Sequence, residues 1–250
     1  MQPDQVKEFL RQIASELSDE TLPQAERFVS IIDNPAPISI RLHPRKAGND
    51  LFNNEERVPW CQAGRYLPER PQFIFEPEFH AGAYYVQEAS SMSIDAVLHE
   101  LFAGNRNIKV LDLCGAPGGK STLLASFLNS EGILVSNEVI RSRAFILKEN
   151  MDKWGFANVI VSNNDPRDFK RLPDYFDLIV CDAPCSGSGM FRKDPETASH
   201  WSEQAVEHCA MRQSRIIEES WNALKPGGIF IYSTCSYSEA EDEEQIKILK

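Results

Sequence analysis

The part of the chain after residue 104 alternates short apolar runs with helical patterns, and this alternation constrains the fold more than any other feature. The runs NIKVLDLC, GILVSNEV, NVIVSNND, FDLIVCDAP and IFIYSTC have the length and composition of buried strands. Strands that alternate with helices form a parallel sheet that helices cover on both faces. We therefore predict an α/β fold in which ligands bind beyond the carboxyl ends of the strands.

Helical patterns fill the gaps between these runs. One helix is predicted to begin near Lys120, and a longer one covers residues 202–225, where the PGG at 226–228 is expected to end it. Ser238 and Glu241 form an S-x-x-E pattern that predicts a capping box for a last helix. The helix after the run GILVSNEV has an apolar side made of Ala144, Leu147, Met151 and Trp154.

The first 95 residues have a different pattern. Helical spacing predicts two helices, one over residues 6–17 and one capped by Thr21. Between residues 34 and 83, prolines punctuate short extended pieces such as PISIRL and QFIFEP, and a helix is predicted over residues 88–101. We therefore predict two domains, a mixed α+β region over residues 1–95 and the α/β domain over residues 96–250.

Composition excludes several classes of protein. The 250 residues are 42% hydrophobic and 25% charged, as in an ordinary globular protein. No run approaches 18 apolar residues and the first residues do not form a signal peptide, so we expect no membrane association and a cytoplasmic location. The six cysteines are then expected to be thiols. Cys181 and Cys185 lack a second pair at matching spacing, so no metal site is predicted.

Charge gives weaker constraints. The net charge of −11 argues against binding nucleic acid by electrostatics alone, although charge acts locally. The acidic run EAEDEE at residues 239–244 supplies five of the negative charges, and SIRLHPRKAG at residues 39–48 is basic. Either run is equally well interpreted as solvated surface.

The sequence LDLCGAPGGKST at residues 111–122 resembles the end of a phosphate-binding P-loop, G-x-x-x-x-G-K-[ST]. The run DLIVCDAP would then be the acid-terminated strand that accompanies such a loop. The motif needs a glycine five positions before Gly119, where this chain has Cys114, and Pro117 removes one backbone N–H donor. An ATP-dependent P-loop enzyme is therefore the less favoured alternative.

A nucleoside cofactor fits the same strand ends better. Gly115, Gly118 and Gly119 would let the backbone approach a bulky ligand closely. Glu138 ends the second strand about 20 residues later, where a carboxylate binds ribose hydroxyls in dinucleotide folds. Asp165 follows the third strand and would meet the adenine. Because the G-x-G-x-x-G spacing of a dinucleotide site is absent, S-adenosylmethionine is the better match.

The chain resembles the Sun-type RNA (cytosine-C5)-methyltransferases over roughly residues 36–245. The resemblance rests on VLDLCGAPGGKST, DAPCSGSGMFRKDPE, LKPGGIFIYSTCSYS and FHAGAYYVQEASSM, and above all on the pairs Pro184-Cys185 and Thr234-Cys235. It implies a Rossmann-like S-adenosylmethionine-dependent methyltransferase fold. The sequence GMFRKDP is similar to bacterial members that act on small-subunit ribosomal RNA. The cofactor contacts implied are Cys114, Gly115, Ala116, Pro117, Gly118, Gly119, Lys120, Glu138, Asp165 and Asp182, with Arg143 a weaker candidate.

Two cysteines stand apart from the others. Cys185 and Cys235 lie beyond apolar runs among Ser, Thr and Gly, whereas Cys61, Cys181 and Cys209 are expected to be small buried hydrophobes. A thiolate that adds to C6 of cytosine makes C5 nucleophilic, which is covalent catalysis. An unperturbed cysteine is only about 3% thiolate at pH 7, so a nearby cation or donor must help.

The residues alone do not say which of the two thiols attacks the base. The resemblance implies that Cys235 is the nucleophile and that Cys185 assists release of the product. We expect Lys120 to stabilise a thiolate and Asp182 to contact N3 of the cytosine.

The expected partner is RNA, with small-subunit ribosomal RNA favoured and transfer RNA as the alternative substrate. A base inside a duplex cannot be reached, so the target is single-stranded or flipped out. The α+β region 1–95 is expected to bind RNA, and Tyr84 and Tyr85 form core or a stacking platform. The candidates for phosphate contacts are Arg41, Arg45, Lys46, Arg65, Arg192 and Lys193.

Lys250 lies inside a helical pattern, whereas the family fold continues with two more strands. We therefore expect a sheet that is incomplete at its C-terminal side. The chain is expected to be a monomer, and a module that binds RNA or cofactor without turnover is the third functional hypothesis.

Overall fold

The computed structural model describes residues 30, 34–48 and 50–247. Apart from Ser30, both helices predicted before residue 34 lie outside this described part. The chain divides into two compact units, which we call the sheet unit (residues 37–182 and 216–232) and the thiol unit (residues 1–36, 183–215 and 233–250). Among the described residues, no helix has the length and apolarity that crossing a membrane requires.

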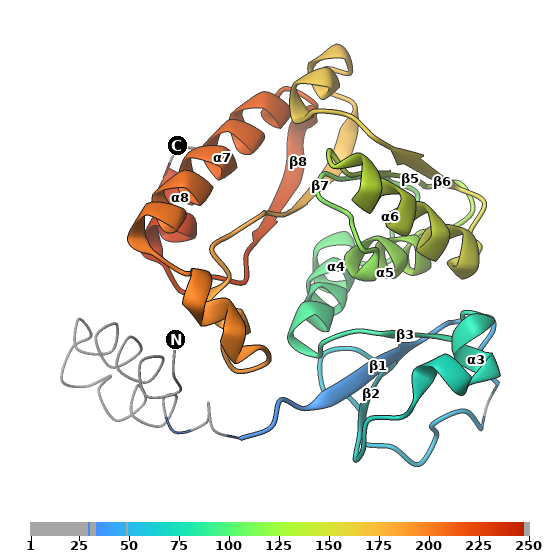
Figure 1. The fold of residues 1–250 in the computed structure, drawn as a ribbon. Coiled ribbons are helices and arrows are strands. Elements are labelled where there is room, and N and C mark those ends of the chain that lie inside the picture. Colours follow the sequence, from blue (N-terminus) through green and yellow to red (C-terminus); the bar gives the residue numbers. More distant parts are fainter. Residues whose placement is uncertain (1–29, 31–33, 49, 248–250) are drawn as a thin grey trace. The chain divides into compact units, whose positions relative to one another are not determined.

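A five-stranded sheet forms the centre of the sheet unit (Figure 1). β4 pairs in parallel with both β5 and β7, and β5 pairs in parallel with β6, which confirms the predicted α/β, Rossmann-like fold. The chain runs outward from β4 and then returns to its other side, so the strand order reverses between β4 and β7. The order across the sheet is β6 (Val159–Ser162), β5 (Ile133–Asn137), β4 (Lys109–Asp112), β7 (Phe176–Asp182) and β8 (Leu224–Ser233).

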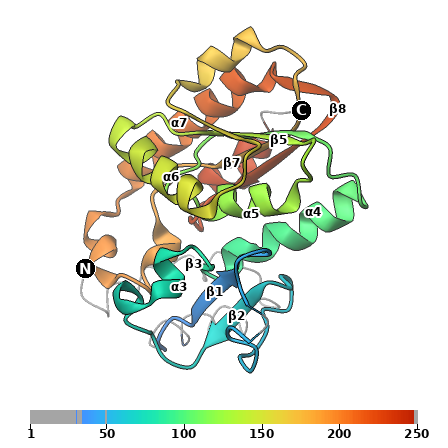
Figure 2. The same ribbon diagram turned by 90° about the vertical axis from the view of Figure 1, so that its right-hand side faces the viewer.

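Three helices pack in sequence against this sheet (Figure 2). They are α4 (Ile94–Phe102), α5 (Gly119–Phe127) and α6 (Arg141–Trp154), and α5 contacts both of the others. The predicted apolar side of α6 is confirmed, since Ala144, Leu147, Met151 and Trp154 are all buried. These side chains and those of α5 form one hydrophobic core with Val110, Leu134 and Leu178 of the strands.

The mixed α+β region contains a small antiparallel sheet with the order β2 (Gly64–Leu67), β1 (Ile38–Leu42), β3 (Tyr84–Val86). The short helices η1 (Phe73–Phe75) and α3 (Pro77–His80) precede β3. Tyr84 is buried with Ile40 and Leu67, so it belongs to the core rather than to a stacking platform. This sheet lies in the same compact unit as the parallel sheet.

Arg41 of β1 joins the small sheet to the glycine loop. Its side chain is buried and donates hydrogen bonds to Gln87 Oε1 (2.7 Å), Gly119 O (3.2 Å) and Thr122 Oγ1 (2.5 Å). The guanidinium carbon also lies 4.8 Å from the centre of the Trp154 ring. Burial lowers the pKa of Arg41 to about 10. Arg41 therefore holds α5 in place and is not the phosphate contact that we predicted.

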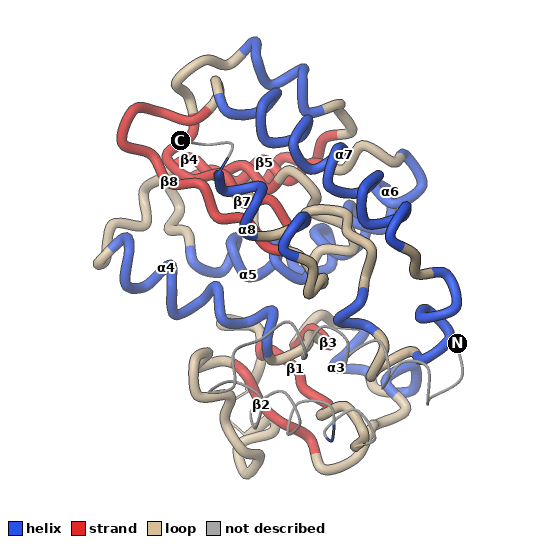
Figure 3. Tube along the Cα trace, turned by 90° about the vertical axis from the view of Figure 1, so that its left-hand side faces the viewer, coloured by secondary structure: helices blue, strands red, loops and turns tan. Residues whose placement is uncertain are grey.

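The remaining helices are α7 (Glu203–Trp221), α8 (Glu243–Lys247) and the 3-10 turns η2 (Ser90–Ser93), η3 (Pro166–Arg171), η4 (Ser188–Met190), η5 (Pro195–His200) and η6 (Glu239–Glu241) (Figure 3). The helix predicted over 88–101 therefore begins as a 3-10 turn and becomes α-helical at Ile94.

Two predicted helix signals are wrong. The PGG at residues 226–228 lies inside β8 and does not end α7, which stops at Trp221. Ala223 O accepts the N–H groups of Tyr175 and Phe176 (3.0 and 2.9 Å), so the chain already pairs with the segment that leads into β7 before it reaches Pro226. Ser238 precedes η6 without a side-chain capping bond, because the Glu241 carboxylate binds other groups described below.

Candidate active site

The loop between β4 and α5 is held together by hydroxyl groups beneath it. Ser121 Oγ donates to the buried Asp112 Oδ2 (2.6 Å) and lies 2.7 Å from Ser136 Oγ. A Cβ atom on Gly115 would lie 2.5 Å from Ser136 Oγ, and Gly118 has a φ of +121°. Gly115 and Gly118 are therefore required by the packing and turn of the loop itself, and the close approach to a ligand stays a prediction.

Side chains of α6 bind the carbonyl groups of the same loop. Arg143 Nη2 donates to Ala116 O (2.8 Å), and Asn150 Nδ2 donates to Pro117 O (2.7 Å) across a cis Ala116–Pro117 peptide. Cys114 opens the loop and hydrogen-bonds to the buried Cys181, which raises the pKa of Cys181, as does its burial. The predicted cofactor segment 114–120 is thus one ordered turn.

Glu138 follows β5 and is almost completely buried. Its Oε1 accepts the N–H of Ile140 (2.9 Å), and its Oε2 lies 3.4 Å from Arg143 Nη1 without forming a hydrogen bond there. A buried carboxylate oxygen without a hydrogen bond is costly unless a ligand supplies the donor. A ribose hydroxyl is such a donor, so this residue fits the nucleoside part of S-adenosylmethionine.

Asp165 lies three residues beyond β6 and has a structural task. Its side chain accepts the N–H of Arg167 (3.2 Å), and the Asp168 carboxylate accepts the N–H of Asp165 (3.1 Å), which makes a capping box for η3. Sequence reasoning missed this box, although D-P-x-D is a recognisable cap pattern. The side chain of Asp165 therefore caps the N-terminus of η3.

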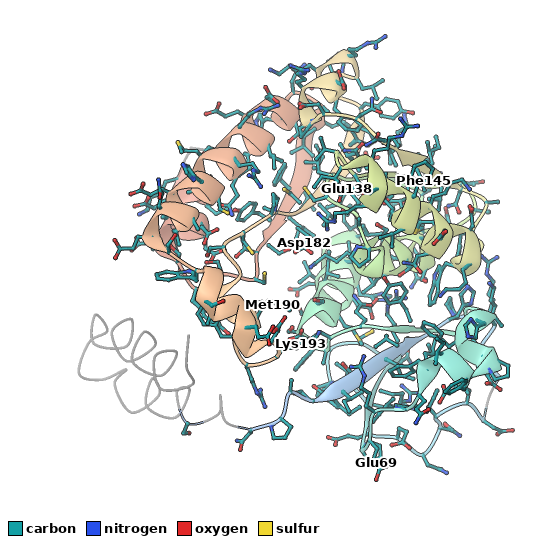
Figure 4. All side chains as sticks on the ribbon, viewed as in Figure 1. Glu69, Glu138, Phe145, Asp182, Met190 and Lys193 are labelled. Carbon is teal, nitrogen blue, oxygen red and sulfur yellow. The ribbon has the colours of Figure 1, made fainter. Side chains whose placement is uncertain are left out.

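The reversal point of the sheet carries an ion pair. Lys120 at the start of α5 and Asp182 at the end of β7 are 2.8 Å apart (Nζ to Oδ1), and the Asp182 side chain is 41% exposed. Glu138 and Asp182 both lie at the carboxyl edge of the five-stranded sheet (Figure 4). Beneath them, burial raises the pKa of Asp112 to about 7. The predicted strand-end acids thus belong to one edge, as ligand binding at the reversal point requires.

The thiol unit brings together the two cysteines that we singled out. The Sγ atoms of Cys185 and Cys235 are 2.8 Å apart, and the N–H of Cys235 donates to Cys185 Sγ (3.2 Å). Cys235 is exposed and Cys185 is half-buried, and neither forms a disulfide. The hydrogen bond from the Cys235 side chain lowers the pKa of Cys185, and the backbone N–H groups of Cys235 and Gly187 act in the same direction. Donors inside the thiol unit therefore stabilise a thiolate.

The other cysteines have the environments of structural residues. Cys61 and Cys181 are buried as predicted, and burial raises the pKa of Cys61 to about 11. Cys209 is half-buried, and its pKa is also raised, chiefly by burial. In the described part of the chain, no group of His, Cys, Asp and Glu side chains is arranged to hold a metal ion.

The predicted phosphate contacts separate into two sets. Arg65, like Arg41, is buried, and its Nη1 donates to the carbonyl groups of Gln62 and Gly64, so it is unavailable for RNA. Arg45 is exposed with its guanidinium carbon 3.9 Å from the centre of the Phe156 ring. Lys46 and Lys193 are exposed, and Arg192 donates to the carbonyls of Asn34 and Pro35 (3.0 and 2.8 Å).

Sequence reasoning missed Glu241, because it lies in the acidic run that we interpreted as solvated surface or as a capping residue. In the structure its exposed fraction is 0%, and its carboxylate lies among Ser186, Gln213 and Ser236. The one signal available was its place six residues after Cys235.

The sequence matches two family descriptions that together span most of the chain. Residues 100–250 match "16S rRNA methyltransferase RsmB/F", and residues 6–89 match "N-terminal domain of 16S rRNA methyltransferase RsmF". The chain is 38% identical to a ribosomal RNA small subunit methyltransferase F of Pectobacterium atrosepticum over 90% of this chain and 49% of that protein. The Vibrio vulnificus protein of the same name is also 38% identical, over 92% of this chain and 51% of that protein.

The chain therefore spans about half the length of the curated relatives it matches. Among solved structures, a methyltransferase homologue from Pyrococcus horikoshii is 32% identical with a TM-score of 0.75, covering 90% of this chain and 73% of its own. The structure of PH0851 has a TM-score of 0.84 at 26% identity, covering 96% and 55%. NSun6 from Pyrococcus horikoshii, solved with SFG, shares the fold with a TM-score of 0.78 at 19% identity, covering 96% and 86%.

Proposed function

This chain belongs to the 16S rRNA methyltransferase RsmB/F family, and we propose that it carries an S-adenosylmethionine-dependent cytosine-C5 methyltransferase activity directed at small-subunit ribosomal RNA. The observation that carries the proposal is the pair of thiols 2.8 Å apart, one exposed and one with a lowered pKa. Such a pair suits a reaction in which one thiol bonds the base and another group moves protons. A P-loop ATPase has no use for it.

The sheet unit supplies the cofactor site in this proposal. Glu138 would bind the ribose through its buried Oε2, and the loop 114–120 would contact the methionine part. Lys120 and Asp182 lie at the reversal point, and Asp165, three residues beyond β6, would approach the adenine. When bound, S-adenosylmethionine supplies an electrophilic methyl group. The residues of this chain have to hold it and keep the edge of the sheet open to a base.

The thiol unit supplies the covalent chemistry. Cys235 is the nucleophile in this proposal because it is the more exposed thiol and because the Thr234-Cys235 pair carries that role in the family pattern. Cys235 loses its thiol proton to solvent, and its thiolate forms a bond to C6 as the C5–C6 double bond opens. Asp182, in its protonated form, donates to N3 and so stabilises the negative charge that develops there as C6 is attacked. After C5 has gained the methyl group, the Cys185 thiolate takes the C5 proton, the C5–C6 double bond forms again, and the Cys235–C6 bond breaks with its electron pair on Cys235.

RNA reaches this site as a single strand or a flipped-out base. We propose that the α+β region 1–95 contributes contacts to the RNA, with Arg45, Lys46, Arg192 and Lys193 as phosphate contacts. The enzyme is proposed to act as a monomer in the cytoplasm. An alternative role, binding without turnover, makes the same contacts but leaves the RNA unmodified.

The test is incubation of the chain with methyl-labelled S-adenosylmethionine and either deproteinised 16S rRNA or transfer RNA, followed by nucleoside analysis. Label in 5-methylcytidine from 16S rRNA is the expected result. Label in transfer RNA alone would keep the chemistry and change the substrate. Binding of S-adenosylhomocysteine with no label in either RNA would support the binding-only role, and stabilisation by magnesium-ATP instead would contradict the proposal.

A further inference from the structure

A buried carboxylate lies beneath the two thiols and contacts the segments that carry both of them. Glu241 Oε1 accepts the backbone N–H of Ser186 (2.8 Å) and Nε2 of Gln213 (3.2 Å). Its Oε2 accepts the hydroxyl groups of Ser186 (2.5 Å) and Ser236 (2.6 Å). An ionised carboxylate is an acceptor with two oxygens, and four donors converge on this one. The site is therefore built around the carboxylate.

The residues that donate to Glu241 have a particular place in the sequence. Ser186 directly follows Cys185, and Ser236 directly follows Cys235. Gln213 Nε2 also donates to the carbonyl of Pro184, on the other side of Cys185 (3.0 Å). One carboxylate thus binds the neighbours of both cysteines, which are 50 residues apart in the chain.

Other hydrogen bonds join the same two segments but do not replace this one. Gly189 N–H donates to Cys235 O (2.8 Å), and Tyr237 N–H donates to Ser188 Oγ (2.8 Å). The first is accepted by Cys235 itself, which also donates its N–H to Cys185 Sγ, whereas the second lies beyond the serines in sequence. Glu241 differs from these bonds because its one side chain binds the residue that directly follows each thiol.

We propose that Glu241 is a positioning residue that clamps the segment of Cys185 to the segment of Cys235 and so fixes the distance between their thiols. Burying a carboxylate destabilises the folded state unless its oxygens accept hydrogen bonds. Here the donors come from the segments of Cys185 and Cys235 and from Gln213. Groups that react together have to be held within a fraction of an ångström by supporting contacts. The benefit of this clamp to catalysis rests on the proposed function. The hydrogen bonds themselves do not, because they form within the chain without RNA or cofactor.

The charge of Glu241 has a second effect on the pair. It raises the pKa of Cys185 and thereby opposes the lowering produced by the Cys235 hydrogen bond. Removing the charge while keeping the shape should therefore move the acid titration of the thiol pair to lower pH. A residue that served only the packing of the unit would not produce that shift.

The acidic run provides a matched control for this assignment. Glu244 belongs to the same run but is exposed, so Glu244→Gln removes the same charge from the chain without touching the thiols. The cysteines outside the pair report on folding. Cys209 is half-buried in the thiol unit and Cys61 is buried in the sheet unit, so alkylation of either at a faster rate than in the wild-type chain marks a loss of structure.

The experiment measures the two thiols in the whole chain, without RNA or cofactor. Diamide, which removes two electrons and two protons from a dithiol, is used to form the Cys185–Cys235 disulfide, and peptide mass spectrometry follows its rate. Iodoacetamide alkylation between pH 5 and 10, read at each cysteine, gives the titration of the pair. We expect Glu241→Ala to slow disulfide formation at least tenfold and Glu244→Gln to change it less than twofold.

Glu241→Gln separates position from charge. The amide retains acceptor capacity for Ser186 N–H, so the disulfide rate should stay within threefold of wild type while the alkylation midpoint moves to lower pH. An unchanged rate in Glu241→Ala, with Cys209 and Cys61 no more reactive than in the wild-type chain, would overturn the clamp. An unchanged midpoint in Glu241→Gln would overturn the effect of the charge.

If Glu241→Ala exposes Cys209 or Cys61, the decisive variant is the double substitution Ser186→Ala and Ser236→Ala. It removes two hydroxyl donors and leaves the carboxylate bound to Ser186 N–H and Gln213. A slower disulfide with Cys209 still protected supports the clamp, and a wild-type rate overturns it. If the wild-type chain fails to transfer a methyl group, the disulfide and alkylation measurements still decide whether the clamp exists, because neither uses RNA or cofactor.

Discussion

The ammonium group of Lys120 and the carboxylate of Asp182 meet at 2.8 Å where the strand order of the parallel sheet reverses. We expected Lys120 to stabilise a catalytic thiolate, but its ammonium group binds Asp182 within the sheet unit. The pKa of Cys185 is lowered instead by hydrogen bonds inside the thiol unit. Lys120 therefore orients Asp182, and its role toward a thiolate stays a prediction.

Asp182→Asn tests the proposed role of this acid in catalysis. The amide oxygen can still accept from Lys120, so we expect the affinity for S-adenosylhomocysteine to change less than about tenfold. The rate of cytosine methylation should fall by roughly 10²–10³, the usual loss when one group that stabilises developing charge is removed. Asp174→Asn, at an exposed position, is the control. Equal loss of cofactor affinity and rate would instead place Asp182 in cofactor binding alone.

Glu138→Ala should abolish stabilisation by the cofactor product. A ligand present at 100 times its Kd stabilises the folded state by about 2.7 kcal/mol, which a thermal shift detects. We expect this shift with S-adenosylhomocysteine in the wild-type chain and in the Glu149→Ala control on the exposed side of α6, and no shift in Glu138→Ala. A full shift in Glu138→Ala would contradict the ribose contact.

Asp112 should make the stability of the protein fall as pH rises. Its pKa of about 7 in the folded protein lies above the ordinary value of 3.8, so between these values the folded state binds the proton and the unfolded state does not. The contribution is complete below about pH 4 and is lost as pH rises toward 7, on the order of 4 kcal/mol in total. Asp112→Asn should flatten this dependence in urea unfolding between pH 5 and 8, while Asp152→Asn should not.

Arg41 and Arg45 should behave oppositely, although they lie in one basic stretch. Arg41→Lys loses the fork that binds Gln87, Gly119 and Thr122, so we expect a destabilisation of about 2–3 kcal/mol. Arg45→Ala should leave the stability almost unchanged and reduce the slope of log Kd against log salt for RNA by about 0.7–0.9. Urea unfolding and RNA titration at several salt concentrations measure the two effects. An unstable Arg45→Ala would show that the Phe156 contact is structural.

The comparison of these two arginines shows what sequence patterns can predict in this chain. Periodicity predicted the parallel strands and the buried side of α6 because each depends on residues close in sequence. The fate of Arg41 depends on Gly119 and Thr122, which are about 80 residues away. Nothing local distinguishes an arginine that crosses to another element from one that faces solvent.

Glu241 and the PGG of β8 illustrate the same limit. Both belong to patterns with a common meaning, an acidic surface run and a helix stop, and both are overridden by partners elsewhere in the chain. The thiols were easier to predict, because a cysteine among Ser, Thr and Gly beyond an apolar run is unusual by itself. Their contact distance and shared proton required the structure.

The roles proposed for Cys185 and Cys235 are separated in time, so single substitutions should trap different species. Cys235→Ala removes the nucleophile, and we expect it to retain cofactor binding but to form no methylated cytidine and no covalent RNA adduct. Cys185→Ala leaves the nucleophile without the group that assists release. It should therefore accumulate a protein–RNA species that survives denaturing gel electrophoresis and requires S-adenosylmethionine. Cys209→Ala is the control and should turn over at a rate close to that of wild type.

The lowered pKa of Cys185 supports the reverse assignment as the alternative, because the more acidic thiol is the one that ionises first and attacks. Accumulation of the adduct in Cys235→Ala, with neither adduct nor methylation in Cys185→Ala, would establish that reversed order, and unchanged methylation in both variants would exclude covalent catalysis by these thiols.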